Sequence, residues 1–318
     1  MPSTNPNRQR FIQPARGGNT FAGELSFLRR TYTQDIDGAD VVVSGIPFDS
    51  ATTFRSGARL GPQAIRAASV QLAELIGRAF PFGINPMEVL AVADYGDCLL
   101  DSGYPQHLVD TVLSHARKLI NSGALMVTLG GDHFVTYPLL RAHAEKYGPL
   151  ALVHFDAHVD TWEDDGERLD HGSMFLRAKR EGLIDVSHSV QIGIRSFSDS
   201  SHGFTVIDAP TVHSQPLQET IAQVLAVVAS QPAYLTFDID CLDPAFAPGT
   251  GTPVVGGLSS AQALGILRGL GALNFVGMDV VEVAPAYDHA EITAIAAATI
   301  AHDFIGLLAR KKLQQDSA

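Results

Sequence analysis

The sequence has little cysteine, no export signal and no obvious membrane segment. Its two cysteines, Cys98 and Cys241, are too few for a disulfide framework in 318 residues. Both have apolar neighbours, so we expect reduced thiols and a cytoplasmic protein. The polar amino terminus, Met1 to Gly18, lacks the apolar core of a secretory signal. We find no uncharged apolar stretch long enough to cross a bilayer, and we therefore expect no membrane partner.

Positive charge is also scarce. Lysine and arginine number 22 against 34 aspartates and glutamates, which gives a formal net charge of −12. Because phosphates attract basic surfaces, this balance argues against nucleic acid as the main partner. It mildly favours a small cationic ligand.

Apolar runs of strand length alternate along the chain with amphipathic helical patterns. The runs cover residues 41–46, 89–92, 125–129, 151–155, 189–194, 234–237 and 274–278, and the helical patterns cover 106–121, 136–147, 217–230, 259–270 and 291–312. Most runs are continuously apolar, as expected for strands covered on both faces. Such alternation predicts a three-layer α/β/α domain with a mainly parallel sheet. We expect one domain over residues 1–318, with an amino-terminal arm over 1–40 and a catalytic core over 41–318.

Polar motifs follow four of the predicted strands directly. They are Gly130–His133, Asp156–Asp160, Asp238–Pro244 and Asp279–Glu282. In parallel α/β sheets, the ligand crevice lies beyond the carboxyl ends of the strands. The four motifs are therefore expected to meet in one crevice.

Two of these motifs crowd carboxylates together. In an extended chain alternate side chains share a face, which would align Asp156, His158 and Asp160. The same rule would align Asp238 with Asp240. Unpaired, these carboxylates would repel each other strongly, whereas two divalent cations would balance the four negative charges. A lone aspartate at a strand end is usually a cap and a lone histidine is usually packed, but the recurrence of a shared face favours a metal site.

The donor set also indicates which metal and which chemistry to expect. It is rich in oxygen, includes two imidazoles and contains no thiolate, a combination that suits Mn²⁺ better than Zn²⁺ or Mg²⁺. Two such ions can share a bridging hydroxide and activate it near neutral pH. The sequence therefore predicts a binuclear hydrolase.

The same motifs resemble the signature motifs of the arginase–agmatinase ureohydrolases. The resemblance runs from about Val41 to the carboxyl terminus and is supported by His171–Phe175, Ala247–Pro253 and Glu282–Pro285. It implies an eight-stranded parallel sheet within the three-layer fold, which the metal-dependent deacetylases share. It also implies a two-manganese centre and a homo-oligomer, trimeric or hexameric.

The resemblance assigns a role to each site residue. One Mn²⁺ would be held by His133, Asp156, Asp160 and Asp238, and the other by Asp156, His158, Asp238 and Asp240. His171 matches the family's proton-shuttling histidine, and Glu282 matches the carboxylate that orients the guanidinium group. Asp160 would also hydrogen-bond the attacking hydroxide. The implied reaction cleaves a guanidinium group into urea and an amine.

The loop between Asp160 and His171 bears on the rest of the substrate. It is rich in carboxylates, and we assign Glu163 and Asp165 to substrate binding. An acidic loop tolerates a cationic tail better than an anionic one. This favours agmatine, with putrescine and urea as products and a place in polyamine metabolism. A solvated loop without substrate contact is the other interpretation.

Three other functions stay open. Guanidinobutyrate or another guanidino compound could be the substrate. A metal-dependent deacetylase has a related fold but generally uses one catalytic zinc. A catalytically silent binding subunit would typically lose metal ligands, and none of the six is missing here. His154 shares the parity of the ligands and could support one of them, but it is interpreted, like Cys241, as a packed core residue. Arg59 and Arg66 are interpreted as structural.

Overall fold

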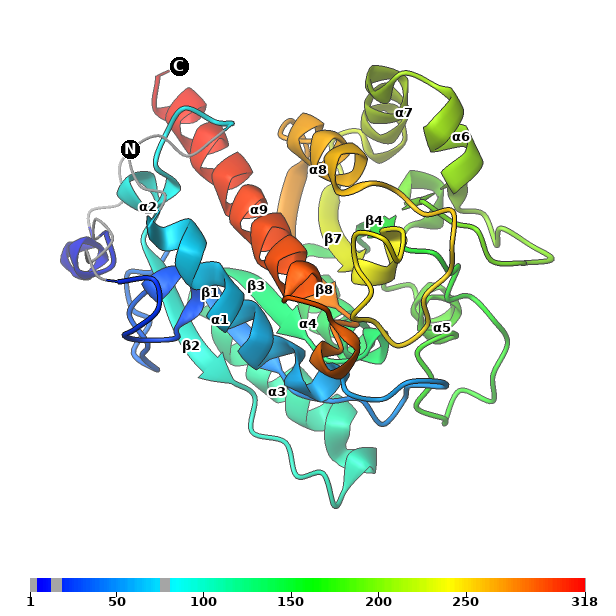
Figure 1. Ribbon diagram of the computed structural model, residues 1–318, viewed down its shortest axis with the longest axis horizontal. Helices are drawn as coiled ribbons and strands as arrows, with labels where there is room; N and C mark the ends of the chain where they lie inside the picture. Colours follow the sequence, from blue (N-terminus) through cyan, green and yellow to red (C-terminus); the bar gives the residue numbers. More distant parts are fainter. Residues whose placement is uncertain (1–4, 13–18, 75–80, 318) are drawn as a thin grey trace.

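A central parallel sheet organises the chain (Figure 1). The computed structural model describes residues 5–12, 19–74 and 81–317, so the predicted arm over 1–40 lies partly outside the described residues. Eight strands lie in the order β2-β1-β3-β8-β7-β4-β5-β6, and every neighbouring pair is parallel. Their bounds are β1 Val41–Ile46, β2 Val92–Asp97, β3 Leu125–Gly130, β4 Ala151–Phe155, β5 Val190–Ile192, β6 Thr205–Ile207, β7 Pro232–Asp238 and β8 Asn274–Val281.

Helices cover both faces of the sheet, which confirms the predicted three-layer α/β/α fold. On one face lie α1 (Gly61–Glu74), α2 (Pro86–Val89), α6 (Ala209–Ser214), α7 (Leu217–Val228), α8 (Ser260–Gly269) and α9 (Ile292–Asp316). On the other lie α3 (Leu108–Asn121), α4 (Thr136–Tyr147) and α5 (Met174–Arg180). Strands β1 and β4 are buried at every position because each face of the sheet lies under a helical layer.

Two differences from the predicted strands have local causes. The apolar run at 89–92 was predicted as a strand, but residues 86–89 form α2 and the strand begins only at Val92. Asn85 caps that helix by accepting a hydrogen bond from the Met87 N–H, and Pro86 takes the first helical position. Strand β6 was missed, because its three residues are too short to give an apolar pattern.

Helix α9 is the described segment that bears on the expectation of no uncharged apolar span, and it contains the charged residue Asp303. By length and composition alone, Ile292–Asp316 is long and apolar enough to do so. In the fold, 67% of its most apolar window is buried inside the protein. It packs against α1 and α8, and its buried Asp303 pairs with Arg268 of α8. The composition of α9 therefore fits a core helix.

The strand order brings the four polar motifs together. Strands β3, β8, β7 and β4 are consecutive neighbours at the centre of the sheet, and each carries one of the motifs at or near its carboxyl end. The fourth motif was predicted to follow its strand, but residues 279–281 belong to β8 and only Glu282 lies beyond it. The motifs are far apart in sequence, and only the order of the strands makes them adjacent. The candidate site thus lies at the carboxyl edge of the sheet centre.

Gly131 allows the first motif to leave the sheet. A Cβ atom at this position would overlap the backbone carbonyl oxygen of Phe48, which accepts a hydrogen bond from the Asp132 N–H at 2.7 Å. We therefore expect Gly131→Ala to lower the free energy of unfolding by about 2 kcal/mol or more and to weaken metal binding. At Gly271 an added Cβ would make only ordinary contact, 3.4 Å from Leu307, so Gly271→Ala is the matched control in urea unfolding. Equal unfolding midpoints for the two variants would contradict the steric argument.

Candidate metal centre

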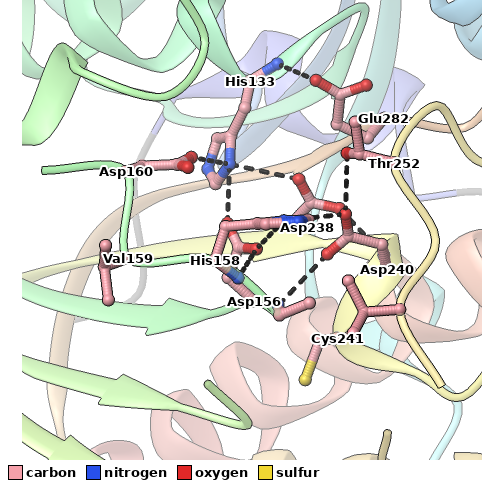
Figure 2. A network of polar contacts seen from close by, with 12 residues as sticks. His133, Asp156, His158, Val159, Asp160, Asp238, Asp240, Cys241, Thr252 and Glu282 are labelled. Atoms are coloured by element: carbon pink, nitrogen blue, oxygen red, sulfur yellow. Dashed lines mark hydrogen bonds and ion pairs between the residues drawn. The ribbon is translucent and has the colours of Figure 1, made fainter. Parts of the chain in front are cut away.

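Three carboxylates surround one nitrogen of His133 (Figure 2). Its Nδ1 lies 3.0 Å from Asp156 Oδ2, 2.9 Å from Asp160 Oδ2 and 3.2 Å from Asp238 Oδ2. All four side chains are buried. We call these four side chains, His133, Asp156, Asp160 and Asp238, the first cage. They come from the ends of β3, β4 and β7.

A second cage adjoins the first and shares Asp156 with it. His158 Nδ1 lies 3.2 Å from both Asp156 Oδ1 and Asp240 Oδ2. The two oxygens of Asp156 therefore face different cages, as a bridging ligand requires. Asp240 is held by the Ala157 N–H, which donates to its Oδ1 at 3.1 Å, and by the Thr252 hydroxyl, which donates to its Oδ2 at 3.2 Å.

The geometry of the first cage fits a divalent cation. Within the part of the chain that the structure describes, His133 Nδ1 is buried without a hydrogen-bond partner, although three carboxylate oxygens lie near it. Two ligand atoms about 2.2 Å from one ion and at right angles to each other are about 3 Å apart, close to the spacings seen here. Burial and neighbouring carboxylates raise the pKa of Asp238 and of Asp160, a sign of repulsion that a cation would relieve. His133, His154, Asp156 and Asp160 form one cluster with metal-ligand spacing, and Asp156, His158 and Asp240 form another.

The structure brings all six predicted ligands together, but the predicted extended conformation is wrong. Strand β4 ends at Phe155, and Asp160 has a left-handed backbone with φ of 50°. His158 is placed by a turn in which its N–H donates to Asp156 Oδ1 at 2.6 Å. Asp240 lies in a short 3₁₀ helix, Ile239–Cys241, capped by Asp238. Aspartate side chains thus bend the backbone that carries the next ligand.

His154 was predicted to be a packed core residue, and it also contacts a ligand. Its ring packs on Phe175, and its Nε2 lies 2.7 Å from Asp156 Oδ2. The side-chain amide of Gln191 donates to the Val159 carbonyl oxygen and to His154 Nδ1. With Nδ1 accepting, the ring hydrogen is on Nε2 and points at Asp156. His154 therefore supports a ligand by donating a hydrogen bond to it.

Glu282 and His171 form a pair beside the first cage. Glu282 Oε1 accepts from the His133 backbone N–H and from His171 Nδ1, both at 2.8 Å. The second oxygen, Oε2, is buried and has no hydrogen-bond partner among the described residues. His171 Nε2 accepts from the Thr53 N–H at 3.1 Å and contacts the Thr53 hydroxyl at 2.8 Å. The pair leaves one carboxylate oxygen free for a cationic donor.

This pair predicts a pH dependence of stability. Burial alone would lower the pKa of His171, but the charge and hydrogen bond of Glu282 raise it to about 9. The protonated pair therefore stabilises the fold fully below the ordinary histidine pKa of about 6.5, and this contribution is lost as pH rises through 9. We expect the metal-free wild type to be more stable than His171→Gln at pH 6, with the difference shrinking by up to about 1.4 kcal/mol per pH unit between these limits. Urea unfolding at pH 6 to 10 measures it, and a constant difference would contradict the pairing.

Sequence reasoning missed several residues that hold the site. Thr53 and Thr252 carry no signal of their own, because isolated threonines in loops are common. The partly buried guanidinium of Arg195 donates to three carbonyl oxygens of the turn at residues 240–242. Its place directly after the apolar run at 189–194 is the sequence signal that could have suggested this role.

The acidic loop has partners of its own. Glu163 is 68% exposed and pairs with Arg180, and Asp165 accepts from the backbone N–H groups of Glu167 and Arg168. Asp164 is buried and pairs with Arg177 at the base of the loop. These contacts join the loop to itself and to α5, so the assignment of Glu163 and Asp165 to substrate binding stays a prediction.

The fold and the site together define a class: a parallel α/β protein with a two-cation carboxylate–imidazole centre at the carboxyl edge of its sheet. The sequence pattern of the Arginase family matches residues 39–306. The chain therefore belongs to the arginase family, and the expectation of a ureohydrolase enzyme is confirmed at that level.

Individual relatives agree with this assignment. The agmatinase of Chromobacterium violaceum is 61% identical over 297 residues, which cover 93% of this chain and 92% of the relative. The agmatinase of Shigella sonnei is 56% identical, with 86% and 89% covered. A crystal structure described as a hypothetical agmatinase from Burkholderia thailandensis superposes with a TM-score of 0.93 at 58% identity and covers 96% of both chains. Proclavaminate amidino hydrolase from Streptomyces clavuligerus gives 0.86 at 40%, with 92% and 100% covered.

Proposed function

We propose that this protein hydrolyses agmatine to putrescine and urea with two Mn²⁺ ions. The observation that carries the proposal is the pair of cages beside a buried carboxylate oxygen with no partner, Glu282 Oε2. The agmatinase relatives support the choice of agmatine within the family. An acidic chain of net charge −12 also suits a substrate that is cationic at both ends.

Six side chains would hold the metal ions. They are His133, Asp156, Asp160 and Asp238 in the first cage and Asp156, His158, Asp238 and Asp240 around the second. When bound, such a pair of ions lowers the pKa of water so that it can attack a guanidinium carbon near neutral pH. Oxygen and imidazole donors without thiolate favour Mn²⁺ over Zn²⁺. Metal analysis of the active protein tests this choice, and full activity with zinc alone would contradict it.

Glu282 would bind the guanidinium group, and His171 would transfer the proton. Glu282 Oε2 would accept from a guanidinium N–H and hold the planar group in place, since its other oxygen is already fixed by two donors. His171 would relay a proton to the departing amine. Its Nε2 accepts from the Thr53 N–H in this structure, so a proton could leave from that nitrogen only after this contact opens. Thr53 keeps that nitrogen at a defined position. Glu282 raises the pKa of His171 against the effect of burial, which favours a ring that can take up and release a proton.

A substrate panel tests the proposal directly. After Mn²⁺ loading, urea release from agmatine should exceed release from arginine and guanidinobutyrate by at least about tenfold in kcat/KM. Preference for guanidinobutyrate would replace the substrate and leave the reaction type intact. Acetate release from acetyl-lysine peptides would indicate a deacetylase. No product from any of these compounds would favour a silent subunit.

Assembly and location are further parts of the proposal. We propose a cytoplasmic homo-oligomer, trimeric or hexameric, in keeping with the family resemblance and the reduced cysteines, both of which are buried. Light scattering on the purified protein measures the oligomer. A monomeric mass for fully active protein would contradict this part alone.

A further inference from the structure

Asp279 is a buried carboxylate for which the proposed reaction has no use. It lies on β8, between β3 and β7 at the centre of the sheet, and its side chain is fully buried. Three hydroxyl groups donate to it. Thr236 donates to Oδ1 at 2.6 Å, and Thr136 and Tyr234 donate to Oδ2 at 2.9 Å each.

Thr236 connects this carboxylate to the first cage. Its hydroxyl oxygen lies 2.8 Å from His133 Nε2, on the side of the ring opposite the three carboxylates. A hydroxyl has one hydrogen, and here it is directed to Asp279. The same oxygen must therefore accept from His133, which places the ring hydrogen on Nε2.

That assignment determines what His133 can bind. With its hydrogen on Nε2, the neutral ring presents a lone pair at Nδ1, the atom that faces Asp156, Asp160 and Asp238. A lone pair among three carboxylates suits a cation, either a metal ion or a proton that the ion would displace. If Thr236 donated to Nε2 instead, the hydrogen would move to Nδ1 and block the metal position.

We propose that Asp279, acting through Thr236, is a positioning residue that fixes the tautomer and orientation of His133 and so sets the metal affinity of the first cage. The inference rests on the metal centre of the proposed function and deepens it. It concerns one cage only, because His158 in the second cage is not in contact with Thr236 or Asp279 among the described contacts and is 17% exposed at its side chain. We call the hydrogen-bonded series Asp279–Thr236–His133 the relay. The two metal sites should therefore respond differently when a substitution interrupts it.

The test is Mn²⁺ titration of the full-length protein, with free Mn²⁺ measured by electron paramagnetic resonance. In Thr236→Val, the Mn²⁺ ion in the second cage should keep its wild-type Kd. The Mn²⁺ ion in the first cage should bind about 10- to 100-fold more weakly. Thr236→Ser keeps the hydroxyl and should stay within about threefold of wild type at both sites. Thr220→Val is the matched control, because Thr220 is also a fully buried threonine but lies on α7, outside the relay.

Asp279→Asn gives a second, independent test if Thr236→Val does not fold. It keeps the shape of the side chain but supplies an amide, which disturbs the direction of hydrogen bonds through Thr236, so the Mn²⁺ ion in the first cage should again bind more weakly. Unchanged affinity at both sites in the folded variants overturns the relay, and so does equal weakening at both. If the wild type releases urea and Thr236→Val binds Mn²⁺ with unchanged affinity, only this inference is contradicted. A wild type that binds no metal sinks the proposed function itself.

Discussion

Asp238→Asn should abolish tight binding of divalent ions and lower urea release by at least about a thousandfold. Asp238 lies at the junction of the two cages. One of its oxygens is 3.2 Å from His133 Nδ1, and the other accepts the Asp240 N–H that starts the turn carrying the second cage. A metal pair contributes several kcal/mol to a hydrolytic transition state, and each 1.36 kcal/mol is about tenfold in rate. Calorimetric Mn²⁺ titration and a urea assay measure the two losses together.

A second effect of the same change separates metal loss from misfolding. In the metal-free fold, burial and the charges of Asp240 and Asp156 raise the pKa of Asp238. A carboxyl whose pKa is higher in the folded than in the unfolded state destabilises the fold at pH values above its unfolded pKa. A neutral amide removes that penalty at pH 7, so metal-free Asp238→Asn should melt at a higher temperature than metal-free wild type.

Added Mn²⁺ should then reverse the order of the two proteins. A ligand at 100 times its Kd stabilises the fold by about 2.7 kcal/mol, and only the wild type should gain this. Asp243→Asn is the matched control, since Asp243 is an aspartate of the same segment that accepts from the backbone N–H groups of Ala245, Gly256 and Gly257 and lies outside the cages. Retained metal binding and activity in Asp238→Asn would contradict the bridging position.

The convergence of the six ligands could be predicted from the sequence, because the same chemistry recurs at several strand ends. The strand order could not. Nothing local in the sequence says that β8, from the end of the chain, inserts between β3 and β7. Pairing between strands depends on contacts made across the whole chain, whereas a pattern of apolar residues reports only on its own segment.

The six ligands were predicted to converge, but the extended backbone from which this was inferred is not the observed one. Extended chains would have aligned Asp156 with His158 and Asp238 with Asp240, yet both pairs lie in turns made by the side chain of the first aspartate. Turn chemistry of this kind competes with strand geometry and leaves no periodic signal. The sequence pattern also gave no sign of the hydrogen bonds that join Asp279 to His133 through Thr236. Its hydroxyl lies on a strand that the sequence identified only as apolar.

Glu282→Gln should leave metal binding intact and still lower kcat/KM by about a hundred- to a thousandfold. The amide has the same shape, and its oxygen can accept from the His133 N–H and from His171 as Glu282 Oε1 does. Its nitrogen would then occupy the position of Oε2, the buried oxygen with no partner. There it would present a donor to the donors of a guanidinium group, so an attractive contact becomes a repulsive one.

The pH profile of Glu282→Gln distinguishes this account from a general loss of structure. The charge of Glu282 raises the pKa of His171 against the effect of burial, so a neutral residue at 282 should lower that pKa. Because activity requires the protonated ring, the basic limb of kcat/KM should move to lower pH by one unit or more, about 1.4 kcal/mol. Glu145→Gln, at an exposed pair with Arg117, should leave the profile unchanged. A basic limb that stays in place while the rate falls would mean that Glu282 binds substrate without tuning His171, and a wild-type rate would exclude it from the site.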